Sequence, residues 1–421
     1  MIINFLRPIV LFLILSTVLF ACKNETKQKL EISSTSQNTS ETIGLIENPS
    51  RGNSALPRLF GNEKELFMSW VEQKDSLSVL YFSSFKDGRW SKALEVNSGT
   101  DWFINWADFP AIAENNGNII VSYLQKSANG KYTYDAKINL YSAVTQTWKN
   151  DILLHNDGTA SEHGFVSVVP QGKSSFFAVW LDGRNTMGSS IDHQTHGIGA
   201  MTLRGRIIHA DGTMEDELAL DNRVCDCCQT AMVSIQDAPV IVYRDRTENE
   251  VRDISRIAPL DDSFSPSQPI YRDNWKIAAC PVNGPAIASF DKSVAVAWFT
   301  AVNNLAKVQV VFSNDMGKTF GSPIQINDNE TLGRVDVVMV SEEAAIVSWM
   351  EKRGDETSIQ VMRVSADGNK EFPITLSNTS FERSSGFPQL EISNNSLYAA
   401  WTMVDGKKTS IKTAKISLSD L

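Results

Sequence analysis

Four cysteines in the middle of the chain have the most distinctive chemistry. Cys225, Cys227 and Cys228 lie within four consecutive positions, and Cys280 follows later in the chain. Thiols this close together can form disulfide bonds, bind a soft metal ion such as copper or zinc, or act as a redox-active pair. In the metal alternative, three histidines could add nitrogen ligands: His163, His193 and His196. An even number of cysteines favours disulfides if the protein is exported.

A second group of residues is suited to the recognition of a carboxylate. The planar guanidinium group of arginine binds carboxylates through paired hydrogen bonds. The candidate ligand-binding residues are Arg184, Arg244, Arg246, Arg334, Arg383, Asp108, Asp182, Trp106 and Tyr243. Because Asp182 and Asp245 lie close to arginines in sequence, the alternative is that these side chains form ion pairs with one another. The residue types do not identify a catalytic residue, and none is assigned.

A repeat in the sequence positions these residues. A short apolar strand that ends in an aromatic residue recurs seven times, and its copies end at Trp70, Tyr123, Trp180, Tyr243, Trp298, Trp349 and Trp401. A period of roughly 50 to 60 residues indicates stacked supersecondary units, and units made of strands form a β-propeller. We therefore predict an all-β fold, a seven-bladed β-propeller of four-stranded blades. A six-bladed propeller is the alternative if one unit is degenerate.

The strands of one unit can be read directly from the apolar alternation. In the fifth unit we expect them at residues 285–288, 294–298, 308–313 and 323–326. The seventh unit lacks a fourth strand, which residues 42–46 could supply. Such closure would join the two ends of the chain and remove exposed strand edges.

Two kinds of loop share one face of a propeller built in this way. They are the loops that lead into the first strand of a blade and those that join its second strand to its third. The cysteines and arginines named above fall in these loops, which are the usual place for binding chemistry on a rigid scaffold. Because equivalent loops of neighbouring blades lie close together, we expect Cys280 to approach the Cys225–Cys228 segment. At least one disulfide between the two loops is expected in oxidised protein.

One turn of the fifth unit carries a recognisable motif. Its defined positions are Ser313, Asp315, Gly317, Thr319 and Phe320, which match the Asp-box pattern S-x-D-x-G-x-T-W/F. In such a turn the Asp and Thr oxygens bind turn amides, the glycine takes a positive φ and the aromatic ring packs between blades. The motif is therefore expected to be structural, and Asp315 is not a catalytic candidate.

The Asp-box and the blade period together resemble the sialidase / BNR-repeat superfamily over roughly residues 43–421. The segments 224–230 and 279–285, which contain the four cysteines, look like those of exported bacterial sialidase-like propellers. The resemblance implies a propeller fold, and exo-α-sialidase activity (a glycoside hydrolase) as an alternative to ligand binding alone. The family uses an arginine triad, a Tyr–Glu nucleophile pair and an Asp acid/base. The F/Y-R-I-P motif of the family is absent from this sequence. In the most similar segment, residues 56–59, Pro57 comes before Arg58.

The first residues of the chain are typical of an export signal. Residues 1–21 carry a single Arg7 before an apolar run and end at Ala21, directly before Cys22. The segment resembles a bacterial lipobox, which implies cleavage before Cys22 and diacylation of that cysteine. The alternatives are a plain secretory signal and an uncleaved N-terminal anchor. Residues 22–42 are expected to form a flexible tether and residues 43–421 the propeller. The predicted location is the bacterial cell envelope, as an outer-membrane, periplasmic or surface-exposed lipoprotein.

The charge of the chain narrows the classes of partner. The formal net charge is −10, and no run of Lys and Arg alternates with aromatic residues. Nucleic acid is therefore not an expected partner, and contact with the membrane is expected through the lipid anchor only. We predict that a glycan or other anionic small ligand binds the Cys/Arg-rich face. The alternatives are an exo-α-sialidase and a metal-binding or protein-interaction scaffold.

Overall fold

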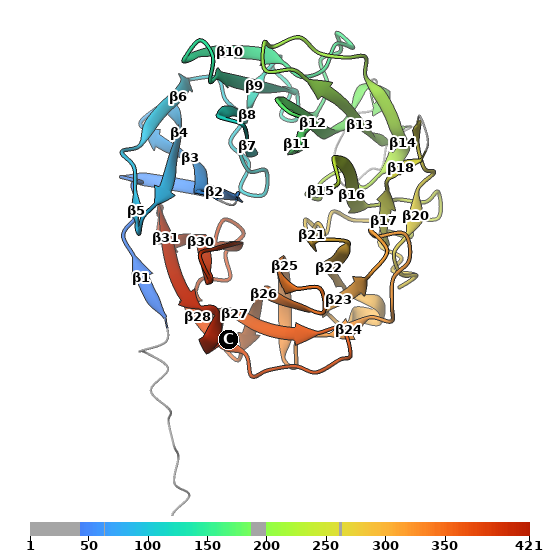
Figure 1. Cartoon of the computed structure of the whole chain (residues 1–421). Helices are drawn as coiled ribbons and strands as arrows, with labels where there is room; N and C mark the ends of the chain where they lie inside the picture. The colour runs from blue at the N-terminus through green and yellow to red at the C-terminus, as the bar shows by residue number, and fades with distance from the viewer. Residues whose placement is uncertain (1–42, 63, 187–198, 261–262) are drawn as a thin grey trace, which may run out of the picture. The chain divides into compact units, whose positions relative to one another are not determined.

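The computed structural model describes residues 43–62, 64–186, 199–260 and 263–421. Seven antiparallel sheets, each with four main strands, follow one another around a ring (Figure 1). The prediction of an all-β, seven-bladed propeller is confirmed, and the six-bladed alternative is wrong. In the described part of the chain the only helical segments are three short 3-10 turns, at Arg184–Thr186, Val302–Asn304 and Leu418–Asp420. No helix there is long and apolar enough to cross a membrane.

The first three blades follow in chain order, each written from its innermost strand outward. Blade 1 contains β2 (Asn53–Gly61), β3 (Leu66–Lys74), β4 (Leu77–Lys86) and β6 (Leu94–Gly99), with the short β5 (Arg89–Trp90) also paired to β4. Blade 2 contains β7 (Ile112–Asn115), β8 (Asn118–Lys126), β9 (Tyr134–Ser142) and β10 (Thr147–Leu153). Blade 3 contains β11 (His163–Gln171), β12 (Ser175–Asp182), β13 (Met201–Ile208) and β14 (Leu218–Val224).

The remaining blades have the same order of strands. Blade 4 contains β15 (Ala231–Ile235), β16 (Ala238–Arg244), β17 (Ile254–Ile257) and β20 (Gln268–Pro269), and a small hairpin of β18 (Pro259–Leu260) and β19 (Ser263–Phe264) precedes β20. Blade 5 contains β21 (Ala286–Phe290), β22 (Ser293–Thr300), β23 (Lys307–Ser313) and β24 (Ile324–Gln325). Blade 6 contains β25 (Glu330–Ser341), β26 (Ala344–Arg353), β27 (Glu356–Ser365) and β28 (Ile374–Thr379).

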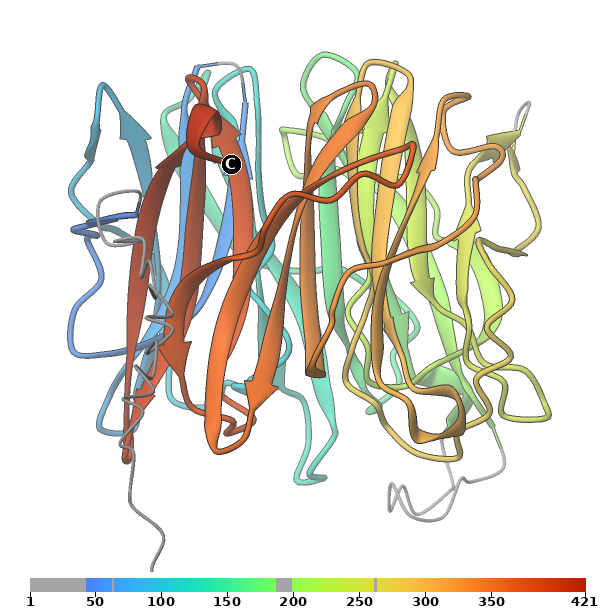
Figure 2. The same ribbon diagram turned by 90° about the horizontal axis from the view of Figure 1, so that it is seen from below.

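Blade 7 is completed by the beginning of the described chain. It contains β29 (Gly386–Ser393), β30 (Ser396–Asp405) and β31 (Lys408–Ser417), and β1 (Gly44–Ile46) pairs antiparallel with β31. Leu45 lies opposite Ala414 in this pairing. The predicted closure is therefore confirmed, and it covers the edge that β31 would otherwise expose. The strands run between two faces of the ring, where the loops gather (Figure 2).

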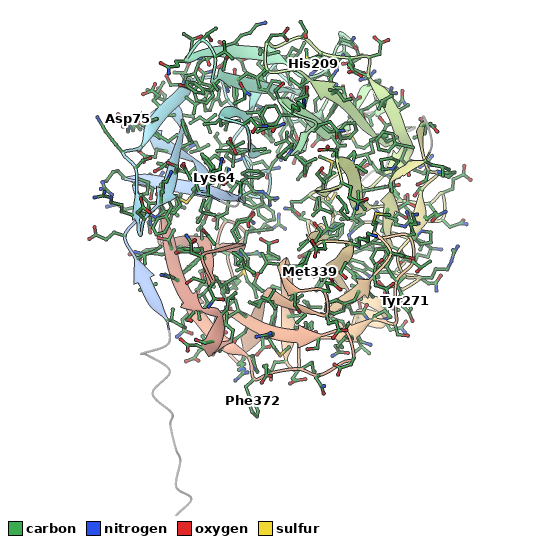
Figure 3. All side chains as sticks on the ribbon, in the orientation of Figure 1. Lys64, Asp75, His209, Tyr271, Met339 and Phe372 are labelled. Carbon is green, nitrogen blue, oxygen red and sulfur yellow. The ribbon has the colours of Figure 1, made fainter. Side chains whose placement is uncertain are left out.

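The recurring aromatic residue of each unit is a packing element. The side chains of Trp70, Trp180, Trp298, Trp349 and Trp401 are at most 1% exposed, and those of Tyr123 and Tyr243 are buried as well. Side chains fill the spaces between the blades (Figure 3). Full burial of one large apolar side chain contributes about 1.5–3 kcal/mol. The aromatic residue thus recurs in the sequence because each blade needs it to pack against its neighbours.

The Asp-box forms the structural turn that the sequence predicts. It joins β23 to β24, and Asp315 accepts hydrogen bonds from the Thr319 amide (2.9 Å), the Thr319 hydroxyl (2.6 Å) and the Ser313 hydroxyl (2.7 Å). Gly317 has a φ of 74°, a conformation that favours glycine. Phe320 packs against the apolar cluster shared by blades 4 and 5.

Candidate functional site

Four of the seven innermost strands carry the same irregularity near their start. In β2, β11, β25 and β29 one extra residue shifts the register with the next strand. A non-glycine residue with positive φ lies at each of these bulges: Leu56, Phe165, Arg334 and Phe387, with φ between 52° and 60°. Such backbone conformations cost of order 1–3 kcal/mol each and cluster at functional sites. Bulges also redirect side chains, so the four strands share the same backbone distortion at one end of the ring.

The bulges place polar residues around a cavity at the centre of the propeller. We call it the mouth cavity, and each blade contributes to its lining: Arg58, Asp108, Ser167, Gln229, Asn283, Arg334 and Gln389. Four of these lie at a bulge or two residues after one. The cavity has a volume of about 70 Å³, which has room for a few water molecules or a carboxylate group.

The mouth cavity opens into a wider hollow of about 750 Å³ at the other end of the innermost strands. Both share Arg58 and Asp336, and Met339, labelled near the centre of Figure 3, lines the hollow. The charged residues that line the hollow are Arg58 and three acidic residues, Glu114, Asp336 and Glu391. Burial raises the pKa of Glu391 to about 7 and that of Asp336 to about 6. An anionic ligand is therefore better suited to the mouth cavity than to the hollow.

Two arginines line the mouth cavity, and neither forms a salt bridge within 4 Å in the described part of the chain. Arg58 interacts electrostatically with Asp336 and Glu391 at longer range. Arg58 Nη1 donates to Gln389 Oε1 at 2.6 Å, and Arg334 Nη1 donates to the carbonyl oxygens of Glu382 (3.0 Å) and Ser385. The guanidinium carbon of Arg334 lies 4.8 Å from the centre of the Phe387 ring. Neutral groups thus accept the hydrogen bonds of both cations, so the charge of Arg334 and part of the charge of Arg58 are available to a bound anion.

The environment of Arg334 is strongly desolvated. Burial, together with the nearby charge of Arg383, lowers the pKa of Arg334 to about 10. Trp106 also stacks near this guanidinium, 5.9 Å from its ring centre, and it packs against Phe387. A guanidinium that has lost its water and gained no counter-ion interacts strongly with an incoming carboxylate.

Asp108 is one of two acidic residues that line the mouth cavity, the other being Asp336. The Asp108 side chain is 6% exposed, and its Oδ2 accepts a hydrogen bond from the Phe165 amide at 2.6 Å. Burial raises the pKa of Asp108 to about 7, although the Phe165 amide opposes the shift. The carboxyl group can therefore hold a proton near neutral pH and can donate it.

The other predicted arginines are engaged elsewhere. Arg184 binds Asp182 (2.6 Å) and Glu217 (2.8 Å), and Arg246 binds Asp226 (3.1 Å) and Glu250 (2.8 Å). For these two the ion-pair alternative describes the structure. Arg383 is exposed and does not line the mouth cavity.

Two further ligand-binding candidates are part of the core. The guanidinium of Arg244, 2% exposed, donates to the backbone carbonyls of Asn283, Arg252 and Phe299. Tyr243 is 1% exposed, and its hydroxyl binds Asp221 (2.5 Å) and Ser267 (2.6 Å). The structure therefore brings together Trp106, Asp108 and Arg334, and it separates them from Arg184, Arg244, Arg246 and Tyr243.

A Tyr–Glu pair lies beside Asp108. The Tyr134 hydroxyl donates to Glu162 Oε1 at 2.5 Å, and burial and the Glu162 charge raise the pKa of Tyr134 well above its usual value. The Tyr134 side chain is fully buried, and its ring stacks on Phe103 with 4.1 Å between ring centres. The pair is present, but its tyrosine does not line the mouth cavity.

His163 belongs to a buried polar network rather than to the cysteines. Its ring stacks on that of His155 (3.5 Å between centres), and its Nε2 lies 3.3 Å from Asp157 and 3.7 Å from Asp182. Asp135 completes the network at 3.4 Å from His155 Nε2. The groups of metal-ligating side chains that include His163 contain no cysteine. The other two histidines of the metal alternative, His193 and His196, lie outside the described residues.

The cysteine segment is buried beside the mouth cavity. Cys225, Cys227 and Cys228 are 1%, 8% and 2% exposed, and their sulfur atoms lie within 4.8 Å of one another. Cys280 packs against the apolar core cluster to which these three cysteines belong. The predicted approach of Cys280 to the segment is thus confirmed. The described chain contains no disulfide bond, so the predicted cross-blade disulfide of oxidised protein stays a prediction.

Arg58 and the bulges were not foreseen from the sequence. The signal was present for Arg58, because the segment around it aligns with the first strands of the other units. In that alignment Arg58, Ser167, Asp336 and Gln389 occupy equivalent positions, each two residues after the positive-φ residue. No comparable signal exists for the bulges themselves, since three of the four positive-φ residues are apolar.

Comparison with known proteins supports the fold. No family model matches the chain, and no curated protein is similar to it in sequence. Among solved structures, a polysaccharide lyase of family PL25, an ulvan lyase, matches with a TM-score of 0.55 and 10% identity over 89% of this chain and 96% of that chain. A protein of unknown function from Dyadobacter fermentans matches with a TM-score of 0.51 and 13% identity over 89% of this chain and 98% of that chain. At such identities the likeness shows a shared fold alone.

Sialidases also match, at lower scores. The NanB sialidase from Streptococcus pneumoniae has a TM-score of 0.45 and 13% identity over 90% of this chain and 70% of that chain. This likeness is too distant to indicate a function.

Proposed function

We propose that the protein is an exported, lipid-anchored β-propeller that binds an anionic glycan at the mouth cavity. One observation carries the proposal: Arg58 and Arg334, from blades 1 and 6, line a single cavity and form no salt bridge with a carboxylate among the described residues. The cavity accepts a carboxylate group, and the rest of the glycan lies on the loops around it. Trp106 offers an aromatic surface there, and Gln229 and Asn283 offer amide groups.

The fold is compatible with such a ligand. One of the similar structures is a PL25 ulvan lyase bound to -[GlcA(1-4)Rha3S]-, with a TM-score of 0.54 and 11% identity. Glucuronate is a sugar with a carboxylate, which is the group that two arginines would recognise. We take the uronate glycans as the class to test first. The anchor, which rests on Cys22 and the preceding apolar run, would hold the propeller at the cell envelope where such glycans are met.

The test is a binding titration with oligosaccharides that do and do not contain uronate residues. Wild-type protein should bind the uronate oligosaccharides and not the neutral ones. Arg58→Gln should weaken binding about tenfold or more, because a charge-assisted hydrogen bond is worth about 1.5–3 kcal/mol and 1.4 kcal/mol is tenfold. Arg89→Gln, which removes an exposed arginine of blade 1 distant from the cavity lining, is the matched control. Equal binding by the two variants would contradict the proposal.

A second candidate function is cleavage of a glycosidic bond, and Asp108 is the observation that favours it. Its carboxyl group lines the cavity and its pKa is raised to about 7 by burial, as suits a general acid. The sialidase form of this hypothesis asks for three converging arginines and an accessible Tyr–Glu pair. The mouth cavity is lined by two arginines, and Tyr134 is buried. Release of product from a fluorogenic sialoside or from uronate oligosaccharides, lost in Asp108→Asn, would establish cleavage.

A further inference from the structure

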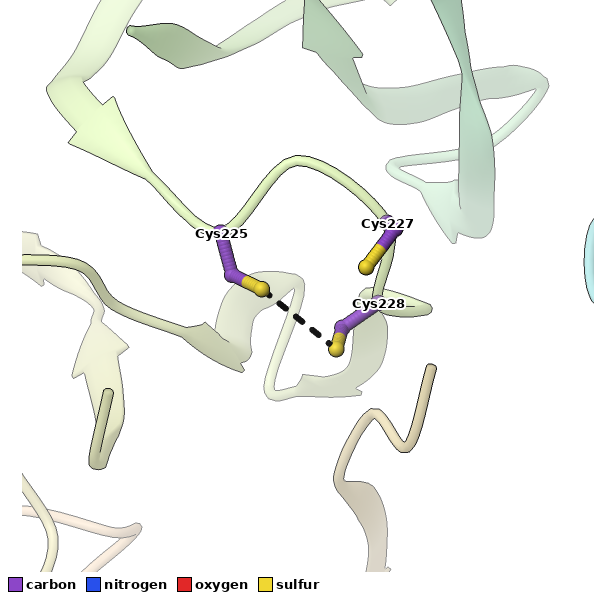
Figure 4. A group of neighbouring side chains, drawn as sticks. All are labelled: Cys225, Cys227 and Cys228. Atoms are coloured by element: carbon purple, nitrogen blue, oxygen red, sulfur yellow. Dashed lines mark hydrogen bonds between the residues drawn. The ribbon is translucent and has the colours of Figure 1, made fainter. Parts of the chain in front are cut away.

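The three clustered cysteines present their sulfur atoms to one point. Figure 4 shows the side chains of Cys225, Cys227 and Cys228 turned toward one another. The Sγ atoms of Cys225 and Cys228 are 3.6 Å apart. In a tetrahedral zinc–thiolate site with Zn–S bonds of about 2.3 Å, neighbouring sulfurs lie about 3.8 Å apart. The spacing therefore fits two ligands of one metal ion.

The fourth cysteine comes from the adjacent blade. Cys280 lies in the loop that enters blade 5 and packs against the apolar core cluster that contains the three cysteines, although its sulfur is not among those that all lie within 4.8 Å of one another. The two loops are held in close contact, since the Gly284 amide donates to Gln229 Oε1 at 2.9 Å. A Cβ atom on Gly284 would collide with the backbone of Gln229. A ligand from blade 5 is thus available to a site on the blade 4 side.

The surroundings compensate the charge that bound thiolates would bring. Arg252 is 0% exposed, and its Nη1 donates to Cys225 Sγ at 3.2 Å. Four thiolates and one divalent cation carry a net charge of −2, and this guanidinium, which also pairs with Glu250 at 2.8 Å, offsets part of it. The backbone of Cys225 is fixed as well, because its amide donates to the Arg244 carbonyl at 3.0 Å. A buried, pre-arranged set of thiols next to a cation is a suitable host for a thiophilic ion.

From this geometry we propose that Cys225, Cys227 and Cys228 bind a closed-shell thiophilic cation, Zn²⁺ or Cu⁺, with Cys280 as the fourth ligand. Such a site would join blades 4 and 5 beside the mouth cavity, and its binding free energy would add to the stability of the fold. It is independent of the glycan proposal, because none of its ligands lines the mouth cavity. The competing occupant of the same thiols is a pair of disulfides.

The test uses the full chain in detergent, reduced without oxygen and titrated with Co²⁺ as a coloured substitute for Zn²⁺. We expect one Co²⁺ per chain with intense thiolate charge-transfer bands in the near ultraviolet, displaced by Zn²⁺. A parallel titration with Cu⁺ against a chelator distinguishes the two cations. Cys225→Ser and Cys228→Ser should each weaken binding at least tenfold, and Cys280→Ser should reduce the charge-transfer intensity. Cys22→Ser, which leaves all four propeller cysteines in place, is the matched control and should bind as the wild type does.

Two results would overturn the metal site. One is the absence of charge-transfer bands and of Cu⁺ binding in fully reduced protein. The other is unchanged binding in the Cys225→Ser variant with a circular dichroism spectrum like that of the wild type, which shows that it folds. If only Cys280→Ser leaves the spectrum unchanged, the fourth-ligand assignment is overturned. Disulfides found by mass spectrometry of unreduced protein, combined with no metal binding after reduction, would assign the thiols to disulfide bonds instead.

Discussion

Replacing Asp108 by Asn removes a buried ionisable group from the mouth cavity. Burial raises the pKa of Asp108 from 3.8 to about 7, a difference of about three pH units. Each unit corresponds to 1.36 kcal/mol, so the ionised carboxylate costs the folded state about 4 kcal/mol. Asparagine keeps the acceptor for the Phe165 amide and carries no charge.

The sign of the pH dependence follows from the direction of this shift. Between pH about 4 and about 7 the folded state holds a proton on Asp108 that the unfolded chain has released, so the free energy of unfolding falls as pH rises. Above pH 7 Asp108→Asn should be more stable than wild type by up to about 4 kcal/mol, and at pH 4 the two should differ by about 1 kcal/mol or less. The burial of Asp336 and Glu391 gives wild type and variant the same additional trend.

Guanidinium chloride unfolding at pH 4, 6 and 8 measures this difference. Asp87→Asn, which removes a carboxylate at an exposed turn, is the matched control. A difference between wild type and Asp108→Asn that is the same at pH 4 and pH 8 would refute the assignment of a raised pKa to Asp108. So would a wild-type protein that is less stable than the variant at pH 4 and equal to it at pH 8.

Two other perturbations test separate parts of the molecule. Asp315→Ala removes the group that accepts hydrogen bonds from the Thr319 amide and hydroxyl in the Asp-box turn. The free energy of unfolding should therefore fall by about 1 kcal/mol, with no loss of glycan binding. Unchanged stability would mean that the turn forms without these hydrogen bonds. Cys22→Ser should prevent lipid attachment and move the protein from the membrane fraction to the soluble fraction of cells, as followed by labelling with a radioactive or alkyne fatty acid. Lipid labelling of the variant at the wild-type level would contradict the lipobox interpretation.

The architecture could be predicted because the sequence pattern of a blade is local and recurs along the chain. Each copy of the repeat contains the alternation of its strands and the aromatic that packs between blades, so seven copies indicate seven blades. The strands expected in the fifth unit agree with β21–β24 within two residues at their ends. The closure by β1 followed from a missing strand in the last unit, since a sheet edge left open at the end of a propeller would be exposed.

The candidate site could be predicted only in part, because the partners of its charges are distant in sequence. The sequence placed Arg244 and Arg334 in loops on the same face of the propeller, as candidates for the same role. In the structure the Arg244 guanidinium donates its hydrogen bonds to backbone carbonyls, whereas Arg334 lines the mouth cavity with Arg58. The difference depends on bulges at positions such as Phe387, where an apolar residue adopts a positive φ that its own propensity disfavours. Such a conformation is imposed by tertiary packing, so it cannot be predicted from local sequence preferences.

The most direct test of the proposed function compares one oligosaccharide with and without its charge. A uronate oligosaccharide and its counterpart with the carboxylates reduced to primary alcohols have nearly the same size and shape. If the mouth cavity binds the carboxylate through Arg58 and Arg334, calorimetric titration of wild-type protein should give at least tenfold weaker binding for the reduced compound. The affinity for the uronate compound should also fall as salt is increased. Equal affinities for the two compounds, or no binding of either, would contradict the account.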